Sequence, residues 1–147
     1  FNIFDQLYIG DSGAYLLGFI VGFFLIKVYQ ANESISPFFI ILLLWYPCFE
    51  NLFSIVRKFK FKKSPVFPDT KHLHQLLFYF IKKKFLKKNI YSNNLASFLV
   101  LFYNIIIFIF AGNYISNSKL HIFLIFLNVI IYIFLYSRLL LFKYKIK

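Results

Sequence analysis

The chain has 147 residues, of which 61% are hydrophobic and 24% aromatic, and its mean hydropathy is +0.71. This composition excludes a soluble domain, which must cover its core with polar surface, and predicts an integral membrane protein. The charge is lopsided, with 17 Lys+Arg against 5 Asp+Glu, so either nucleic acid is a partner or the basic residues mark the cytoplasmic side of a bilayer.

A single cysteine, Cys48, excludes an intramolecular disulfide and a metal cluster built from thiolates. The chain begins at Phe1 without a basic segment and small-residue cleavage site of the signal-peptide kind. We therefore expect residues 1–147 to be the C-terminal piece of a longer membrane protein and to form part of one membrane domain.

Four segments are apolar and long enough to cross about 30 Å of hydrocarbon as helices. They predict an all-α polytopic membrane protein with four spans, over residues 13–30, 36–56, 93–112 and 120–141. The connections within the first and last pairs of spans are short and nearly uncharged, whereas residues 57–91 form a long basic loop.

The basic residues indicate how these spans are oriented. With four spans, the start of the first span, residues 57–91 and the C-terminus share one side, and 15 of the 17 Lys and Arg fall there, all except Lys27 and Lys119. Basic residues are retained in the cytoplasm, so this side is predicted to be cytoplasmic. Bilayer topology explains the charges, and we expect no nucleic-acid partner.

Asp11 stands between Gly10 and Gly13, directly before the first span. Aspartate is favoured at helix N-caps, where it contributes about 1 kcal/mol. The glycines also allow close approach of a ligand, so the carboxylate could instead serve a site at the cytoplasmic mouth of the membrane. Both interpretations stay open on this pattern alone.

Glu50 lies late in the second predicted span. A carboxylate there should face the protein interior or a water-filled cavity and pair with a cation. Arg57 and Lys58 are the nearest cations in sequence.

The basic residues over 57–63 could bind anionic headgroups, at about 1 kcal/mol each, or a phosphorylated substrate.

The basic loop has its own local structure. Pro65 and Pro68 each disfavour the α region at the preceding residue, which predicts an extended segment over 64–71. The apolar residues that follow recur at three- and four-residue steps, with lysines opposite, and predict a helix in the headgroup region: Leu73, Leu76, Leu77, Phe80, Ile81 and Phe85. His72 and His74, at the start of this helix, could reach one ligand or form polar surface.

Three stretches, taken in order, resemble one family: "GDSGAYLLGF", "YPCFENLFSIVRK" and "SPVFPDTKHLHQLL". They are similar to the C-terminal half of the polyprenyl-phosphate N-acetylhexosamine-1-phosphate transferases of glycosyltransferase family 4, in particular the bacterial UDP-N-acetylglucosamine:undecaprenyl-phosphate type. The resemblance covers residues 8 to about 80, and the last two spans match only in hydropathy. Its most specific block has residues in family order: Ser64, Pro65, Pro68, Asp69, His72 and His74.

This resemblance implies roles for particular residues. Asp11 is expected to be catalytic and to help hold Mg²⁺, and His72 and His74 are expected to be catalytic and to line the nucleotide-sugar site. The remaining site residues that the resemblance implies are expected to contact substrate: Arg57, Asp69 and Ser64.

Two positions depart from the family pattern. The histidine block commonly has a further histidine where this chain has Gln75, and the acidic residue after the proline is often Asp where this chain has Glu50.

The implied reaction is attack by polyprenyl phosphate on the β-phosphorus of a UDP-sugar, giving a polyprenyl-diphospho-sugar and UMP. Carboxylate oxygens suit Mg²⁺ and basic loops suit the phosphates of such a transfer. The enzyme would initiate a lipid-linked cell-envelope glycan, of the lipopolysaccharide or peptidoglycan kind, from the inner (cytoplasmic) membrane. A homodimer stays open, since the sequence is silent on oligomeric state.

Relatives also carry paired aspartates in an N-terminal half that has no counterpart here, so we expect this chain to be inactive in isolation. The alternative is a non-catalytic membrane module, in which the basic cytoplasmic loop binds anionic lipid or a partner protein.

Overall fold

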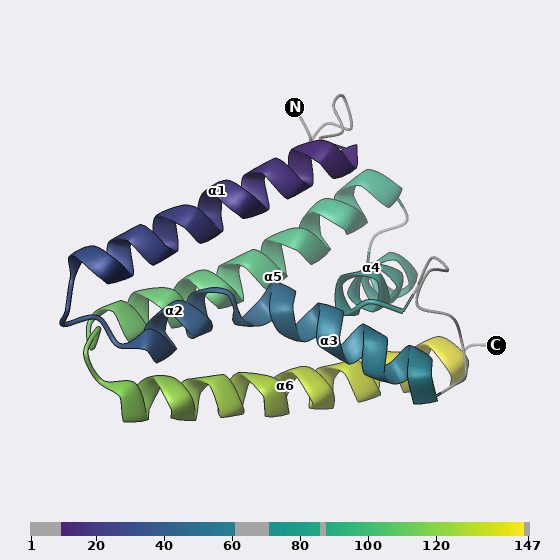
Figure 1. Cartoon of the computed structure of the whole chain (residues 1–147). Coiled ribbons are helices and arrows are strands. Elements are labelled where there is room, and N and C mark those ends of the chain that lie inside the picture. Colours follow the sequence, from purple (N-terminus) through teal and green to yellow (C-terminus); the bar gives the residue numbers. More distant parts are fainter. Residues whose placement is uncertain (1–9, 61–70, 86–87, 146–147) are drawn as a thin grey trace.

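A computed structural model describes residues 10–60, 71–85 and 88–145, the side chain of Asp11 excepted, and their regular secondary structure is entirely helical (Figure 1). Among these described residues, three helices are long and apolar enough to cross a membrane, and a bent pair makes a fourth if it counts as one span. The chain is an all-α polytopic membrane protein, which confirms the predicted fold class. Its helices are α1 (Gly10–Ala31), α2 (Pro37–Leu43), α3 (Trp45–Lys60), α4 (Leu73–Lys84), α5 (Asn89–Gly112) and α6 (Ser118–Lys145).

The second predicted span is bent instead of straight. Helices α2 and α3 meet at Leu44 with an angle of 67° between them. Pro47 lies in the first turn of α3 and has no N–H with which to bond the carbonyl of Leu43, so the helical ladder is interrupted there. At its other end, α2 begins at Ser36, which accepts a 3.2 Å hydrogen bond from the backbone N–H of Phe38.

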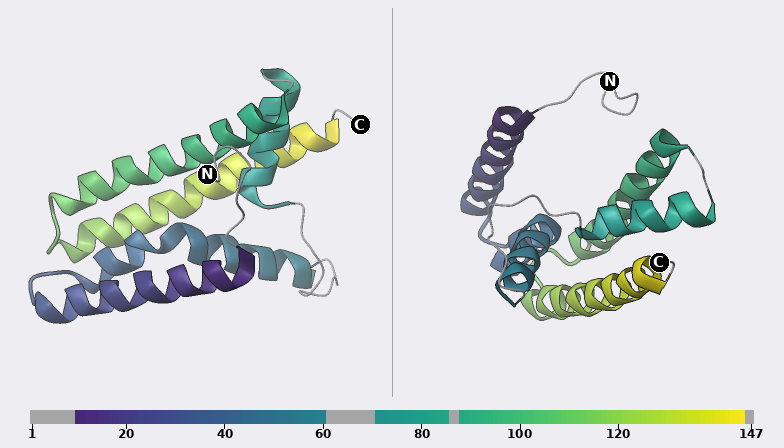
Figure 2. Two further views of the ribbon diagram at one scale, coloured as in Figure 1. Left: turned by 90° about the horizontal axis from the view of Figure 1, so that it is seen from above. Right: turned by 90° about the vertical axis from the view of Figure 1, so that its right-hand side faces the viewer.

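Helix α4 packs against both α5 and α6, at the end of the molecule where these two long helices are apart (Figure 2). Leu73, Leu76 and Ile81 are buried in this contact, so the predicted amphipathic helix is confirmed. Phe85, the last residue of the predicted stripe, is the C-cap of α4, and its ring meets that of Phe80 at a centroid distance of 6.0 Å.

Different segments of the chain lie at the two ends of the molecule. At one end, Ser36 connects two loops: its hydroxyl lies 2.9 Å from that of Ser118, and its N–H donates a 3.0 Å bond to the carbonyl of Ile115. The opposite end gathers the start of α1, the end of α3, helix α4, the start of α5 and the end of α6 (Figure 1). The segments that were predicted to share one side therefore do lie together, and their assignment to the cytoplasm stays a prediction.

The core lies between α2–α3, α4, α5 and α6. Its aromatic centre is Tyr132 of α6, whose ring meets those of Phe49 and Phe53 edge-on at centroid distances of 5.0 and 5.4 Å. Nearer the start of α6, His121 is fully buried against Phe39, with Nε2 3.4 Å from the carbonyl oxygen of Ala111. The core joins the last span to the bent pair, and it thereby positions the end of the molecule where α4 lies.

Candidate functional site

Glu50 is a buried carboxylate that connects three helices. It is 7% exposed, and its Oε1 accepts hydrogen bonds from His72 Nδ1 at 2.9 Å and from the backbone N–H of Leu73 at 3.0 Å. Its Oε2 accepts a 2.8 Å bond from the hydroxyl of Tyr132. Three donors compensate the buried charge, which would otherwise be costly in this apolar setting. Glu50 therefore fixes the start of α4 between α3 and α6.

Arg57 lies two helical turns further along α3 and connects to the same region. Its Nη1 donates a 2.7 Å bond to the carbonyl of Lys71 and a second bond to the hydroxyl of Tyr136, and its Nη2 lies 3.4 Å from Ser54 Oγ. The guanidinium also stacks over the Tyr136 ring, 5.4 Å from its centroid. The cation is thus oriented directly beside the backbone that leads into His72.

Glu50 accepts hydrogen bonds from α4 and α6, and its predicted pairing with Arg57 or Lys58 stays a prediction.

The two histidines come together at the start of α4. Their rings stack with centroids 5.7 Å apart and an angle of 15° between the planes. An ionised carboxylate can only accept, so His72 donates to Glu50 through a proton on Nδ1. The pKa of His74 is lowered, chiefly because the protein partly removes the ring from water; Glu50 opposes this shift and His72 reinforces it.

Gln75, the residue that departs from the family pattern, stabilises the start of α4. Its side-chain oxygen accepts a 3.3 Å hydrogen bond from the backbone N–H of His72. A glutamine at the third helical position commonly satisfies the first backbone donor in this way. The departure therefore has a structural role in this chain.

Three of the six predicted site residues are brought together: Arg57, His72 and His74. Asp11 belongs to the first turn of α1, at the same end of the molecule (Figure 1), but its side chain lies outside the described part. Ser64 and Asp69 also lie outside the described residues. Their predicted roles stay predictions.

Sequence reasoning missed the polar residues of α6. Asn128, Tyr132 and Tyr136 recur at every fourth position, and all three are buried on one face of the helix. Two of them reach the site through hydroxyl groups, to Glu50 and to Arg57. This four-residue period within an apolar span was the signal that could have found them, because such a stripe lies on one face of a helix.

The described side chains do not make up a magnesium site. Among them, no three His, Cys, Asp or Glu side chains gather in a way that could hold a metal ion. Glu50, the buried carboxylate, uses both oxygens for hydrogen bonds. Predicted magnesium binding therefore rests on Asp11, whose side chain is not described.

Comparison with known proteins gives one informative similarity. No protein-family model matches the chain, and no solved structure matches it. Over 71 residues, 48% of its length, the chain is 31% identical to the undecaprenyl-phosphate alpha-N-acetylglucosaminyl 1-phosphate transferase of Thermotoga maritima. The chain spans 23% of that protein. The similarity points to a transferase, and the apolar helices point to a multi-pass membrane protein.

Proposed function

We propose that this chain is part of an enzyme that transfers a sugar 1-phosphate from a UDP-sugar to polyprenyl phosphate and releases UMP. The observation that carries the proposal is that Arg57 bonds the backbone carbonyl of Lys71, the residue before His72. Glu50 and Tyr132 hold His72 in place, and Tyr136 does the same for Arg57. The similarity to a transferase named for undecaprenyl phosphate supports the same reaction.

In the proposed reaction, a phosphate oxygen of the polyprenyl phosphate attacks the β-phosphorus of the UDP-sugar. The bond between this phosphorus and the bridging oxygen breaks, and UMP leaves with that oxygen and its electron pair. The product is a polyprenyl diphosphate that carries the sugar, in our proposal an N-acetylhexosamine. Such transfers depend on positioning and charge neutralisation more than on covalent participation by the protein.

The described residues suit the recognition of phosphates. Arg57 is permanently charged, and its contacts with Lys71 and Tyr136 orient the guanidinium beside the backbone that leads into His72. The lowered pKa of His74 favours a neutral ring near pH 7, able to donate or accept a hydrogen bond with a sugar or phosphate oxygen. Asp11 is proposed as a magnesium ligand, and bound magnesium would neutralise diphosphate charge.

A specific observation also favours a second candidate, a non-catalytic module that binds anionic lipid. Three exposed lysines, Lys82, Lys83 and Lys84, fill the last turn of α4. Clustered lysines beside a membrane attract acidic headgroups by about 1 kcal/mol each. The transferase proposal and this one differ in whether a covalent product forms.

The proposal is tested with membranes from cells that express the complete reading frame containing this chain. They are incubated with UDP-N-acetylglucosamine labelled in the sugar, undecaprenyl phosphate and Mg²⁺. We expect label in the butanol-extractable lipid and an equal amount of UMP. A lipid fraction without label in every tested UDP-sugar, together with binding to anionic vesicles, would support the second candidate instead.

A further inference from the structure

His74 lines a cavity of about 350 Å³ that α3, α4 and α5 enclose, a volume within the range of small-molecule sites, about 300 to 1,000 Å³. The cavity follows α5 from Ser97 to Phe108, which is about 16 Å of helix, and it reaches Pro47, beside the bend between α2 and α3. His74 lies at the end away from this bend, because Glu50, which bonds the start of α4, is one turn beyond Pro47 along α3. The cavity therefore leads from the histidines into the part of the molecule made of membrane-spanning helices.

This cavity is open at its side, and its walls are mostly apolar. Leu101 lines it and is 59% exposed, and it belongs to a helix that is long and apolar enough to span the membrane. Asn104 also lines it, but the side chain of Asn104 already bonds the Trp45 indole and the carbonyl of Val100. A molecule dissolved in the bilayer can therefore enter beside α5 and meet hydrocarbon along most of its path.

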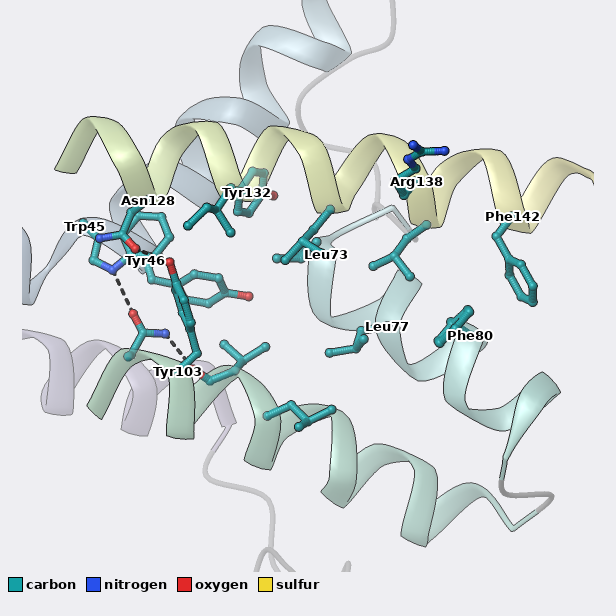
Figure 3. Close-up of a pocket in the computed structure, with 16 residues that line it drawn as sticks. Trp45, Tyr46, Leu73, Leu77, Phe80, Tyr103, Asn128, Tyr132, Arg138 and Phe142 are labelled. Carbon is teal, nitrogen blue, oxygen red and sulfur yellow. Dashed lines mark hydrogen bonds between the residues drawn. The ribbon is translucent and has the colours of Figure 1, made fainter. Parts of the chain in front are cut away.

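A larger cavity, of about 500 Å³, lies beside α4 between α5 and α6 (Figure 3). The two cavities are neighbours, because Tyr46, Val100 and Asn104 line both of them. Among the described residues that line the larger cavity there is no histidine. The smaller cavity is thus the one of these two that joins apolar walls to a histidine side chain.

These features suit one of the two proposed substrates better than the other. Polyprenyl phosphate has a long apolar chain with a phosphate at one end, whereas a UDP-sugar is polar throughout. The path along α5 is about half of the roughly 30 Å of hydrocarbon in a bilayer, so a lipid chain of one leaflet can lie along it. Walls formed by Leu43, Val100 and Phe108 would leave the hydroxyl and phosphate groups of a nucleotide sugar without partners.

His72 lies in different surroundings, although its ring stacks on that of His74 with the centroids 5.7 Å apart. It bonds Glu50, it follows the carbonyl that Arg57 bonds, and it does not line the smaller cavity. Two adjacent rings suit two phosphates held side by side. Transfer between the substrates requires this arrangement, because the reacting atoms must approach to about 3 to 3.5 Å.

We infer that His74 binds the phosphate of the lipid acceptor, with the adjoining part of the acceptor's chain in the smaller cavity, and that His72 serves the nucleotide sugar. The N–H of a histidine ring can donate a hydrogen bond to a phosphate oxygen. The inference rests on the proposed function, and it assigns to different substrates two histidines that the resemblance implies for one nucleotide-sugar site.

The test measures KM for each substrate separately, with the full-length protein in nanodiscs and undecaprenyl phosphate varied as a fraction of the lipid. His74→Ala should raise KM for undecaprenyl phosphate about 10- to 150-fold, the effect of one lost hydrogen bond to a charged group, and leave KM for UDP-N-acetylglucosamine nearly unchanged. His72→Ala is the reciprocal variant, and it should raise KM for the UDP-sugar and not for the lipid.

A second pair of variants tests the cavity and stays informative if His74→Ala fails to fold. Leu101→Trp should narrow the cavity and raise KM for undecaprenyl phosphate more than KM for a short-chain prenyl phosphate. Ile106→Trp, which is 52% exposed on the same helix and does not line the cavity, should raise neither.

Three results would overturn the inference and leave the proposed function in place. They are an unchanged KM for undecaprenyl phosphate in His74→Ala, an equal rise in KM for the UDP-sugar in that variant, and a Leu101→Trp variant that behaves like Ile106→Trp. An unmodified protein without transferase activity would instead remove the proposed function, and this inference with it.

Discussion

The hydroxyl of Tyr132 donates a 2.8 Å hydrogen bond to Glu50 Oε2, although 82 positions separate the two residues in sequence. Through the other oxygen of Glu50, this contact continues to His72 and to the first backbone N–H of α4. Helix α6 thus helps to hold the turn where the histidines lie.

Tyr132→Phe should destabilise the fold, because the buried Glu50 carboxylate loses one of its three donors. A hydrogen bond to a charged group contributes about 1.5 to 3 kcal/mol, so the midpoint of thermal unfolding in detergent should fall by several degrees. Tyr114→Phe is the matched control, since that tyrosine is 51% exposed. Equal midpoints for the two variants would show that the contact contributes nothing.

Tyr136→Phe should impair substrate binding more than folding, because the lost hydroxyl bonds to Arg57 Nη1. In the full-length protein we expect KM for the UDP-sugar to rise about tenfold, the lower end of the effect of one lost bond to a charged group, with kcat less affected. Ser137→Ala is the control on the same helix, since that hydroxyl bonds the carbonyl of Ile133. An unchanged KM would remove Tyr136 from the positioning of Arg57.

His74 should titrate below the usual histidine pKa of about 6.5, and NMR of its ring protons measures this directly. Glu50→Gln should lower its pKa further, because the carboxylate favours the charged ring; Glu33→Gln, an exposed glutamate, is the control. Below about pH 6.5 the unfolded chain takes up this proton more readily than the folded chain, so acidification lowers stability. A midpoint above the usual value would contradict the described surroundings of His74.

The sequence predicted the helical class, the apolar segments and the amphipathic α4 because these depend on local periodicity and hydropathy. It did not predict the bend at Leu44, since average hydropathy is insensitive to the single backbone donor that Pro47 lacks. Neither the Glu50 partners nor the roles of Tyr132 and Tyr136 were found, because these contacts join distant segments. The sequence of an apolar helix does not distinguish its buried tyrosines from those that face the membrane, because the difference depends on where the neighbouring helices lie.

The predicted topology makes the α4 end cytoplasmic and the α1–α2 connection external. Single cysteines replacing Lys83 and Glu33, both exposed, can test this in a Cys48→Ser background. A membrane-impermeant maleimide added to intact cells should label the Glu33 position, and the Lys83 position only after the cells are broken. The reverse pattern would contradict the positive-inside assignment and remove the cytosolic UDP-sugar from reach of the histidines.

The kinetics of His72→Ala in the full-length protein test the central claim most directly, that the turn held by Glu50 and Arg57 recognises the nucleotide sugar. Turnover is measured against UDP-N-acetylglucosamine at saturating undecaprenyl phosphate and Mg²⁺, with equal membrane expression verified. Loss of one hydrogen bond to a charged group predicts a fall in kcat/KM of about 10- to 150-fold. An unchanged kcat/KM in a folded, inserted variant would contradict the claim.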